Sequence, residues 1–446
     1  MTIRFDDSIK TLSKAIKENL GSDGLESGLA LRDAKGQLCF FSPLPITKKK
    51  HADISKKISQ ALGNYARGDR QLVTSDMPGF KSVFEEKSLL IATEEGLVKL
   101  IDRRIIGADW LRIAAIERPS IPRCVFASVK GGVGRSTALA VSAAHFASLG
   151  KSILVIDLDL EAPGLGNMLL NESTMPEFGM VDLLVERGVE QLDTALLVDS
   201  IGPSHFSANK GKIDVVPAFG SRTNKNPHEA LAKLSRAYLE DFSETGATIS
   251  LLDKIRDIVE RLAEQKLYDA VFIDARAGLH ETTAAALLGL SANVMLFGLD
   301  EPQTFTGFKL LLAHLNSNLY DENVRNNWLE RLFFVQGKSE SLTSDDYEVK
   351  CEDLLEQIGL VKREISRNIV TTPNGPFNDV PWLKDSEVSD EELNTENSFN
   401  RTKTLRILNN EIFKNFDPGS KSSLLNRSSY YETYQELLLS IEKFIA

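Results

Sequence analysis

The sequence predicts an α/β fold: a mostly parallel sheet with helices on both faces, a small N-terminal α/β domain before it and a helical C-terminal extension after it. Three observations predict the sheet. From Arg123 onward, short apolar runs alternate with stretches of helical periodicity, which is typical of parallel sheets. The runs are continuously apolar, as in strands that are buried on both faces. A glycine-rich segment directly follows the first run, at the sheet edge where such folds bind ligands.

The strands of the main sheet are expected where the apolar runs lie. These are Cys124–Ala127, Ser152–Asp157, Lys212–Pro217, Ala270–Asp274, Asn293–Gly298 and Arg331–Gln336. The stretches between them with helical spacing are Ala138–Leu149, Glu229–Glu244, Ile249–Gln265 and Thr304–Asn316. Because strands and helices alternate, the helices are expected to cross from one strand to the next and to cover both faces of the sheet.

Residues 1–118 are expected to form the N-terminal domain, for which the sequence indicates no role. Apolar residues recur at helical spacing over Ser8–Leu20 and again over Ala52–Tyr65. Strand-like runs flank two turns, at Gly28–Leu31, Leu38–Phe41, Ser88–Thr93 and Leu97–Leu100. Gly107–Ala115 is expected to close this unit, and residues 117–122, which hold two prolines, are the expected linker.

The core is expected over residues 123–345 and the C-terminal extension over residues 346–446. Helices are expected over Asp346–Leu360, over about 401–415 and over about 428–445. Residues 385–396 are rich in acids and are expected to be an exposed segment. Such an extension would either complete the core or contact a partner.

The glycine-rich segment runs Ser128-Val129-Lys130-Gly131-Gly132-Val133-Gly134-Arg135-Ser136-Thr137. Its glycines lie between a strand and a helix, so bare backbone N–H groups are expected at the helix N-terminus, where the helix dipole also favours an anion. In the phosphate-loop pattern G-x-x-x-x-G-K-[ST], Gly134 and Ser136 fit. Val129 replaces the first glycine and Arg135 replaces the lysine.

The string KGGVGRST resembles the deviant phosphate loop of the ParA/MinD family of ATPases, KGGxGK[ST], and the resemblance implies a P-loop NTPase core. It also implies that Lys130 is the family's signature lysine, which reaches the nucleotide of the partner subunit in a face-to-face dimer. The residues implied to bind ATP are Lys130, Gly131, Gly132, Val133, Gly134, Arg135, Ser136 and Thr137. Arg135 departs from the family pattern, and because a planar guanidinium differs from a compact ammonium, the hydrolysis rate stays open.

Two carboxylate motifs follow at strand ends. Asp157-Leu158-Asp159 resembles the family's D-x-D pair, which implies that Asp157 orients the Mg²⁺ shell and Asp159 positions the attacking water. Asp274 ends an apolar strand and fits the Walker B role, so Ser136, Asp157 and Asp274 are the expected metal-serving residues.

Arg276 lies two residues beyond Asp274. Two alternatives stay open for it: contact with the terminal phosphate or the partner subunit, which would make it catalytic with Lys130 and Asp159, or pairing with a neighbouring acid.

The resemblance implies an ATP-binding and ATP-hydrolysing dimeric switch that uses Mg²⁺ and regulates a partner protein or cargo. A second hypothesis is a bacterial-type tyrosine kinase, because Tyr430, Tyr431 and Tyr434 cluster near the C-terminus. Tyr431 and Tyr434 also fall at helical spacing with Leu438, which favours packing. A third is a nucleotide-sensing scaffold with little turnover, for which Arg135 is the argument.

Composition limits the partners and the compartment. A formal net charge of −11 at pH 7 argues against non-specific nucleic-acid binding by the whole chain, although basic residues between Arg401 and Arg427 leave DNA binding open. No apolar run approaches the roughly 18 residues of a membrane span, and the acidic stretch Tyr434–Ala446 disfavours membrane docking. The three cysteines form no disulfide or zinc pattern, and the N-terminus shows no signal pattern, so a cytoplasmic location is expected.

Overall fold

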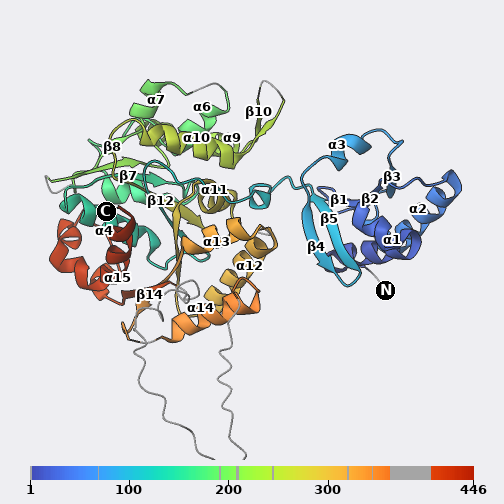
Figure 1. Cartoon of the computed structure of the whole chain (residues 1–446). Coiled ribbons are helices and arrows are strands. Elements are labelled where there is room, and N and C mark those ends of the chain that lie inside the picture. Colours follow the sequence, from blue (N-terminus) through green and yellow to red (C-terminus); the bar gives the residue numbers. More distant parts are fainter. Residues whose placement is uncertain are drawn as a thin grey trace, which may run out of the picture.

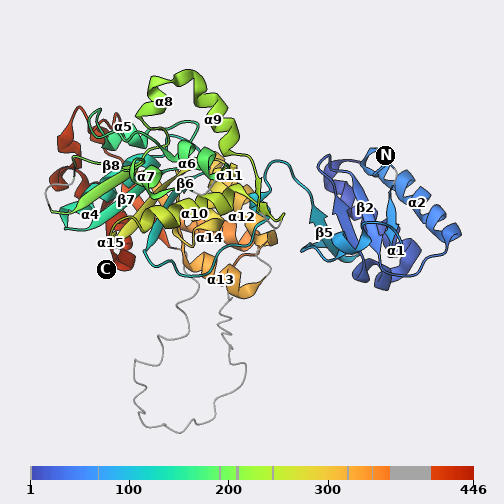
Figure 2. The ribbon, with the colours of Figure 1, turned by 90° about the horizontal axis from the view of Figure 1, so that it is seen from above.

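The computed structural model describes residues 3–68, 70–189, 192–206, 210–243, 246–318, 321–343, 345–361 and 403–445. These residues form a five-stranded sheet, an eight-stranded sheet and a two-stranded hairpin. Figures 1 and 2 show the five-stranded sheet with its helices beside the larger α/β body. None of the helices in the described part of the chain combines the length and the apolarity that a membrane span needs.

The five-stranded sheet has the order β3-β2-β1-β5-β4. Its strands are β1 (Leu29–Arg32), β2 (Leu38–Ser42), β3 (Leu72–Thr74), β4 (Leu89–Thr93) and β5 (Gly96–Asp102), and its helices are α1 (Phe5–Ser27), α2 (Lys48–Leu62) and α3 (Phe80–Phe84). Side chains of α1 and α2 pack with Phe40 on one face, while Phe80 of α3 packs with Phe41 on the other. The strands and the two long helices expected here are confirmed, and β3 and α3 are additions.

The eight-stranded sheet has the order β15-β14-β13-β6-β12-β7-β9-β8. The strands are β6 (Arg123–Ser128), β7 (Ser152–Asp157), β8 (Gly202–Pro203), β9 (Lys212–Val216), β12 (Ala270–Ala277), β13 (Asn293–Gly298), β14 (Leu332–Ser339) and β15 (Thr404–Leu408). Every neighbouring pair is parallel except β8 with β9. The mostly parallel sheet expected from the apolar runs is confirmed, with β6 in its interior.

Helices cover both faces of this sheet (Figure 1). They are α4 (Arg135–Ser148), α5 (Leu165–Leu169), α6 (Met180–Arg187), α7 (Thr194–Val198), α8 (Ser221–Lys225), α9 (Ala230–Ala237), α10 (Leu251–Ala263), α11 (Glu281–Gly289), α12 (Pro302–Asn318), α13 (Glu322–Glu330), α14 (Asp346–Gln357) and α15 (Arg427–Ile445). Cys124 and Phe126 of β6 pack toward α4 and α15, whereas Val125 and Ala127 pack toward α10, α11 and α12. Alternate residues of one continuously apolar strand therefore serve two cores.

Two helix predictions are wrong in part. The stretch Glu229–Glu244 is helical only to the end of α9, after which β10 (Asp241–Phe242) pairs with β11 (Thr248–Ile249). The helix expected over about 401–415 is β15 followed by a 3₁₀ turn at Glu411–Phe413. Leu405 pairs with Val335 of β14, so pairing with a strand distant in the sequence overrides the local pattern. The acidic segment 385–396 lies outside the described residues.

Residues 107–115, which we call the strap, pack on the large body rather than on the N-terminal sheet. Trp110 and Ala114 lie in the same apolar cluster as α10 and α11. The backbone N–H of Ala115 donates to Leu288 O over 2.7 Å, and the N–H of Leu252 donates to Asp109 Oδ2 over 2.9 Å. We therefore propose that the N-terminal domain ends before Gly107 and that β15 and α15 make the C-terminal region part of the core.

Candidate functional site

The glycine-rich loop connects β6 to α4. Gly132 and Gly134 have φ angles of 76° and 90°, in the left-handed region that favours glycine. Gly134 is the N-cap of α4, and no side chain caps that helix end. The first N–H groups of α4 therefore have no side-chain acceptor at the cap, which is the arrangement that binds anions at helix N-termini.

Two other elements hold this loop closely. A Cβ on Gly337, near the end of β14, would lie 2.5 Å from Val133 O, and one on Gly307 of α12 would lie 2.7 Å from Val129 Cγ2. Lys338 Nζ donates to Gly132 O over 3.2 Å. The loop is thus packed from β14 and from α12, and the position of β14 beside the loop allows the Lys338 contact.

Two buried carboxyl groups face each other beside the loop. Asp157 ends β7 and pairs in register with Asp274 of β12. Asp157 accepts the N–H groups of Asp159 over 3.0 Å and Leu165 over 3.3 Å, and Asp274 accepts the hydroxyl of Ser136 over 2.6 Å. Burial and the charge of Asp274 raise the pKa of Asp157 to about 8, and burial also raises the pKa of Asp274.

A glycine loop between an interior strand and a helix, with an acid delivered to the loop serine by the adjacent strand, decides the fold type. The core is a P-loop fold. Asp157 and Asp274 were expected together from their strand ends, and the structure brings them together with Ser136.

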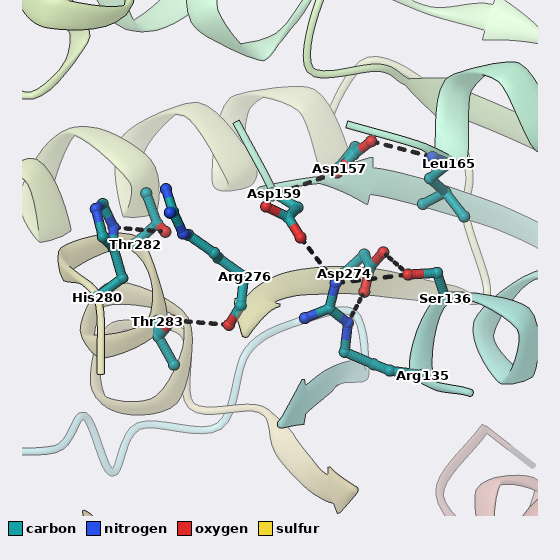
Figure 3. Close-up of polar contacts among 10 residues, drawn as sticks. All are labelled: Arg135, Ser136, Asp157, Asp159, Leu165, Asp274, Arg276, His280, Thr282 and Thr283. Carbon is teal, nitrogen blue, oxygen red and sulfur yellow. Dashed lines mark hydrogen bonds and ion pairs between the residues drawn. The ribbon is translucent and has the colours of Figure 1, made fainter. Parts of the chain in front are cut away.

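Arg135 lies among the acids of the P-loop site. Its Nη2 donates to Asp159 Oδ2 over 3.0 Å, and its Nε lies 2.6 Å from Asp274 Oδ1 as an ion pair. Arg135 is only 8% exposed, and Figure 3 shows its guanidinium between the two carboxylates. The cation that replaces the P-loop lysine therefore neutralises two acids of the site in this structure.

Lys130 lies apart from that buried group. Its Nζ is 2.8 Å from Glu301 Oε2, and both side chains are more than a third exposed. Glu301 lies in the turn that leads into α12. The lysine is thus on the surface at the start of the P-loop, held by a partly solvated ion pair of the kind that contributes little to stability.

Arg276, at the end of β12, forms an ion pair with Glu161. The second of the alternatives for this arginine, pairing with a neighbouring acid, is the one that the structure shows. The hydrogen bond from Arg276 is the main cause that lowers the pKa of Glu161.

The residues expected to serve a metal fit Mg²⁺ held partly by other ligands. Within the described ranges, no three or more His, Cys, Asp or Glu side chains are arranged to hold a metal by themselves. Magnesium usually keeps waters and substrate phosphates as ligands and takes only one or two carboxylates, which Asp157 and Asp274 can supply with the Ser136 hydroxyl. Asp159 Oδ1 is buried without a hydrogen-bond partner, so the site has unused acceptor capacity.

Two other features lie outside this site. A cavity of about 550 Å³ is lined by Arg118, Arg123 and Glu260. It lies at the opposite end of β6 from the P-loop, because Arg123 begins that strand and the P-loop follows its end. The C-terminal tyrosines belong to the core: Tyr430 and Tyr434 are buried in α15. Tyr430 Oη lies 3.2 Å from His145 Nδ1 of α4. These contacts explain the tyrosine cluster by packing.

The sequence matches no known family model and no curated protein. Solved structures similar to this chain include a ParA family ATPase from Chlorobium tepidum TLS, with 16% identity, a TM-score of 0.40 and coverage of 73% of this chain and 97% of that chain. MinD from Aquifex aeolicus has 14% identity, a TM-score of 0.41 and coverage of 73% and 96%.

A putative plasmid partition protein from Borrelia burgdorferi B31, bound to AMPPNP, has 17% identity, a TM-score of 0.39 and coverage of 73% and 99%. These names are those of the family that the loop motif resembles. At such identities and TM-scores the likeness does not show what this chain does.

Proposed function

We propose that this chain is an ATP-dependent switch that binds ATP with Mg²⁺ at the P-loop, hydrolyses it slowly, and associates with a second copy and a partner protein according to the nucleotide bound. The observation that carries the proposal is the convergence of the uncapped α4 N-terminus, the Ser136 hydroxyl and the Asp157–Asp274 pair. This set can bind a phosphate chain and a divalent cation at once.

Each residue has a role in this proposal. The backbone N–H groups from Gly131 to Thr137 bind the phosphates, and Ser136, Asp157 and Asp274 hold Mg²⁺ directly or through its waters. Bound Mg²⁺ neutralises phosphate charge. Asp159 orients the attacking water through its unused Oδ1.

Arg135 leaves Asp159 and Asp274 when the nucleotide binds, because its planar guanidinium can donate two parallel hydrogen bonds to phosphate oxygens. This exchange distinguishes the loop from one with a lysine, whose ammonium acts as a single point charge.

The second copy is the proposed partner of Lys130. The lysine lies on the surface beside the P-loop, and its ion pair with Glu301 is solvated enough to exchange. In the dimer its ammonium would contact the nucleotide of the other subunit, so that ATP holds the interface and hydrolysis releases it.

A nucleotide-sensing scaffold with little turnover is the second candidate. The contact between Arg135 and Asp159 favours it, because the acid expected to position water is already paired with a buried cation. The tyrosine kinase hypothesis loses its support, since two of its three tyrosines are buried.

Thermal melting tests the binding proposal. Mg²⁺-ATP should raise the melting temperature of the full chain, because a ligand that binds only the folded state adds RT ln(1 + [L]/Kd), about 2.7 kcal/mol at one hundred times Kd. Ser136→Ala should lose most of that rise. Ser142→Ala is the matched control, since Ser142 lies on the same helix and, among the described residues, its hydroxyl bonds only to Ala138 O. No rise for the wild type at millimolar Mg²⁺-ATP would contradict the proposal.

A further inference from the structure

Glu161 is surrounded by three side chains from two segments of the chain. It pairs with Arg276, its Oε1 lies 3.3 Å from His280 Nε2, and it accepts a hydrogen bond from Tyr238 Oη over 3.3 Å. Arg276 is the last residue but one of β12, His280 is the N-cap of α11, and Tyr238 follows α9. We call these four residues the Glu161 cluster.

The cluster adjoins the P-loop site. Glu161 follows Asp159 by two residues and Arg276 follows Asp274 by two, so the same strand ends supply both groups. The charge of Asp159 acts on both Arg276 and His280, which places all three within electrostatic reach. Figure 3 shows the Arg276 side chain directed away from Ser136, toward His280 and Thr282.

The backbone between Arg276 and His280 contains a glycine, Gly278, whose backbone angles can change. Gly278 has a φ angle of 94°, and a Cβ there would meet no atom within 4 Å. Its N–H donates to Ser128 O over 2.9 Å, which ties this segment to the strand before the P-loop. A glycine with open space around it can absorb a change in backbone angle at low cost.

We propose that Glu161 is a latch for Arg276: without nucleotide it holds the guanidinium, and the terminal phosphate of bound ATP competes for it. The proposal rests on the function proposed above and adds a step that distinguishes ATP from ADP. Arg276 is the group that contacts phosphate, and Glu161 is a positioning residue. Because His280 and Tyr238 also bind Glu161, its carboxylate stays in place when Arg276 leaves and can take it back after hydrolysis.

The exposure of the pair makes the exchange feasible. The side chains of Arg276 and Glu161 are 26% and 33% exposed, so the arginine can move without opening the core. Carboxylate and phosphate both accept two parallel N–H groups from a guanidinium, so the two partners compete for the same donors.

Glu161→Gln tests the latch in the full chain, because it keeps the shape and removes the charge. Affinities for ATP and ADP, each with Mg²⁺, are measured by titration calorimetry. The variant should bind ATP about two- to fivefold more tightly, the range that a partly exposed ion pair is worth, and ADP as the wild type does. Arg276→Gln should weaken ATP binding alone, and the double variant should match Arg276→Gln.

The control is Asp257→Asn, which breaks the similarly exposed Arg187–Asp257 pair between α6 and α10 and should leave both affinities unchanged. Melting temperatures without nucleotide show which variants fold. If Glu161→Gln does not fold, the ratio of ATP to ADP affinity in Arg276→Gln is used instead: a ratio below that of the wild type supports the latch, and an unchanged ratio overturns it. Unchanged or weaker ATP binding by folded Glu161→Gln, or a gain that persists in the double variant, would overturn the latch alone. If the wild type binds neither nucleotide, the proposed function fails and the latch with it.

Discussion

The guanidinium of Arg135 contacts two acids through two different nitrogens, whereas a lysine would offer a single nitrogen. Arg135 contacts Asp159 and Asp274 through separate nitrogens, while burial raises the pKa values of Asp157 and Asp274. In this structure the arginine therefore stabilises a cluster of acids. Among the described residues, no other cation is bonded to Asp159 or Asp274. The same contacts compete with phosphate binding.

Arg135→Lys should lower stability without lowering activity. One acid loses a charged hydrogen bond, so the free energy of unfolding without nucleotide should fall by about 1–3 kcal/mol. Phosphate release from ATP should stay equal or increase, because Asp159 is freed from its cation. Thermal melting and a phosphate-release assay measure the two effects. Loss of hydrolysis in a folded, ATP-binding Arg135→Lys protein would show that the arginine itself is required.

Among the elements, the strap joins the N-terminal domain to the large body beside the start of α11. The N–H of Gly107 donates to the Glu281 carboxylate in the first turn of α11, directly after His280 of the Glu161 cluster. Asp109 accepts the N–H of Leu252 near the start of α10. Burial is the largest cause that raises the pKa of Asp109 to about 6.

This shift predicts a pH-dependent stability. Since the folded chain keeps the proton on Asp109 up to about pH 6 and the unfolded chain loses it near pH 4, the free energy of unfolding falls as pH rises between these values and stays lower above them. Asp109→Asn cannot ionise, so its stability relative to wild type should increase from pH 4 to pH 6, by on the order of 2 kcal/mol, and then level off. Urea unfolding at pH values across this range measures the difference, and a difference independent of pH contradicts the assignment.

The interior strands could be predicted from sequence because each is a continuous apolar run. Two kinds of element could not be predicted in this way. Edge strands β3 and β15 are short, and β15 is defined by its pairing with β14. Helix α11 is buried on nearly every side, so it lacks the polar stripe that reveals a helix.

The contacts of the site also fall into those that the sequence predicts and those that it does not. Asp157 and Asp274 follow from motifs at strand ends, because strand register brings them together, and Ser136 follows from the loop motif. The contacts of Arg135 with Asp159, and of Tyr238 and His280 with Glu161, depend on how distant segments pack, which no local pattern contains.

For the whole molecule, the described C-terminal residues complete the sheet and cover the α4 face, so Lys130 and the P-loop belong to one continuous body with α15. The N-terminal domain is attached through the strap near α11. The proposed switch then depends on whether a second copy of this body binds at the P-loop face when ATP is present.

Sedimentation velocity of the full chain measures that association most directly, with Mg²⁺-ATP and with Mg²⁺-ADP, in the wild type, Lys130→Ala and Lys151→Ala. Lys151 is the matched control, since its ion pair with Asp269 is as exposed as that of Lys130. The proposal predicts an ATP-dependent dimer in the wild type and Lys151→Ala, and monomers in Lys130→Ala that still bind ATP. A wild type that stays monomeric with bound ATP, or a Lys130→Ala protein that dimerises equally well, would contradict it.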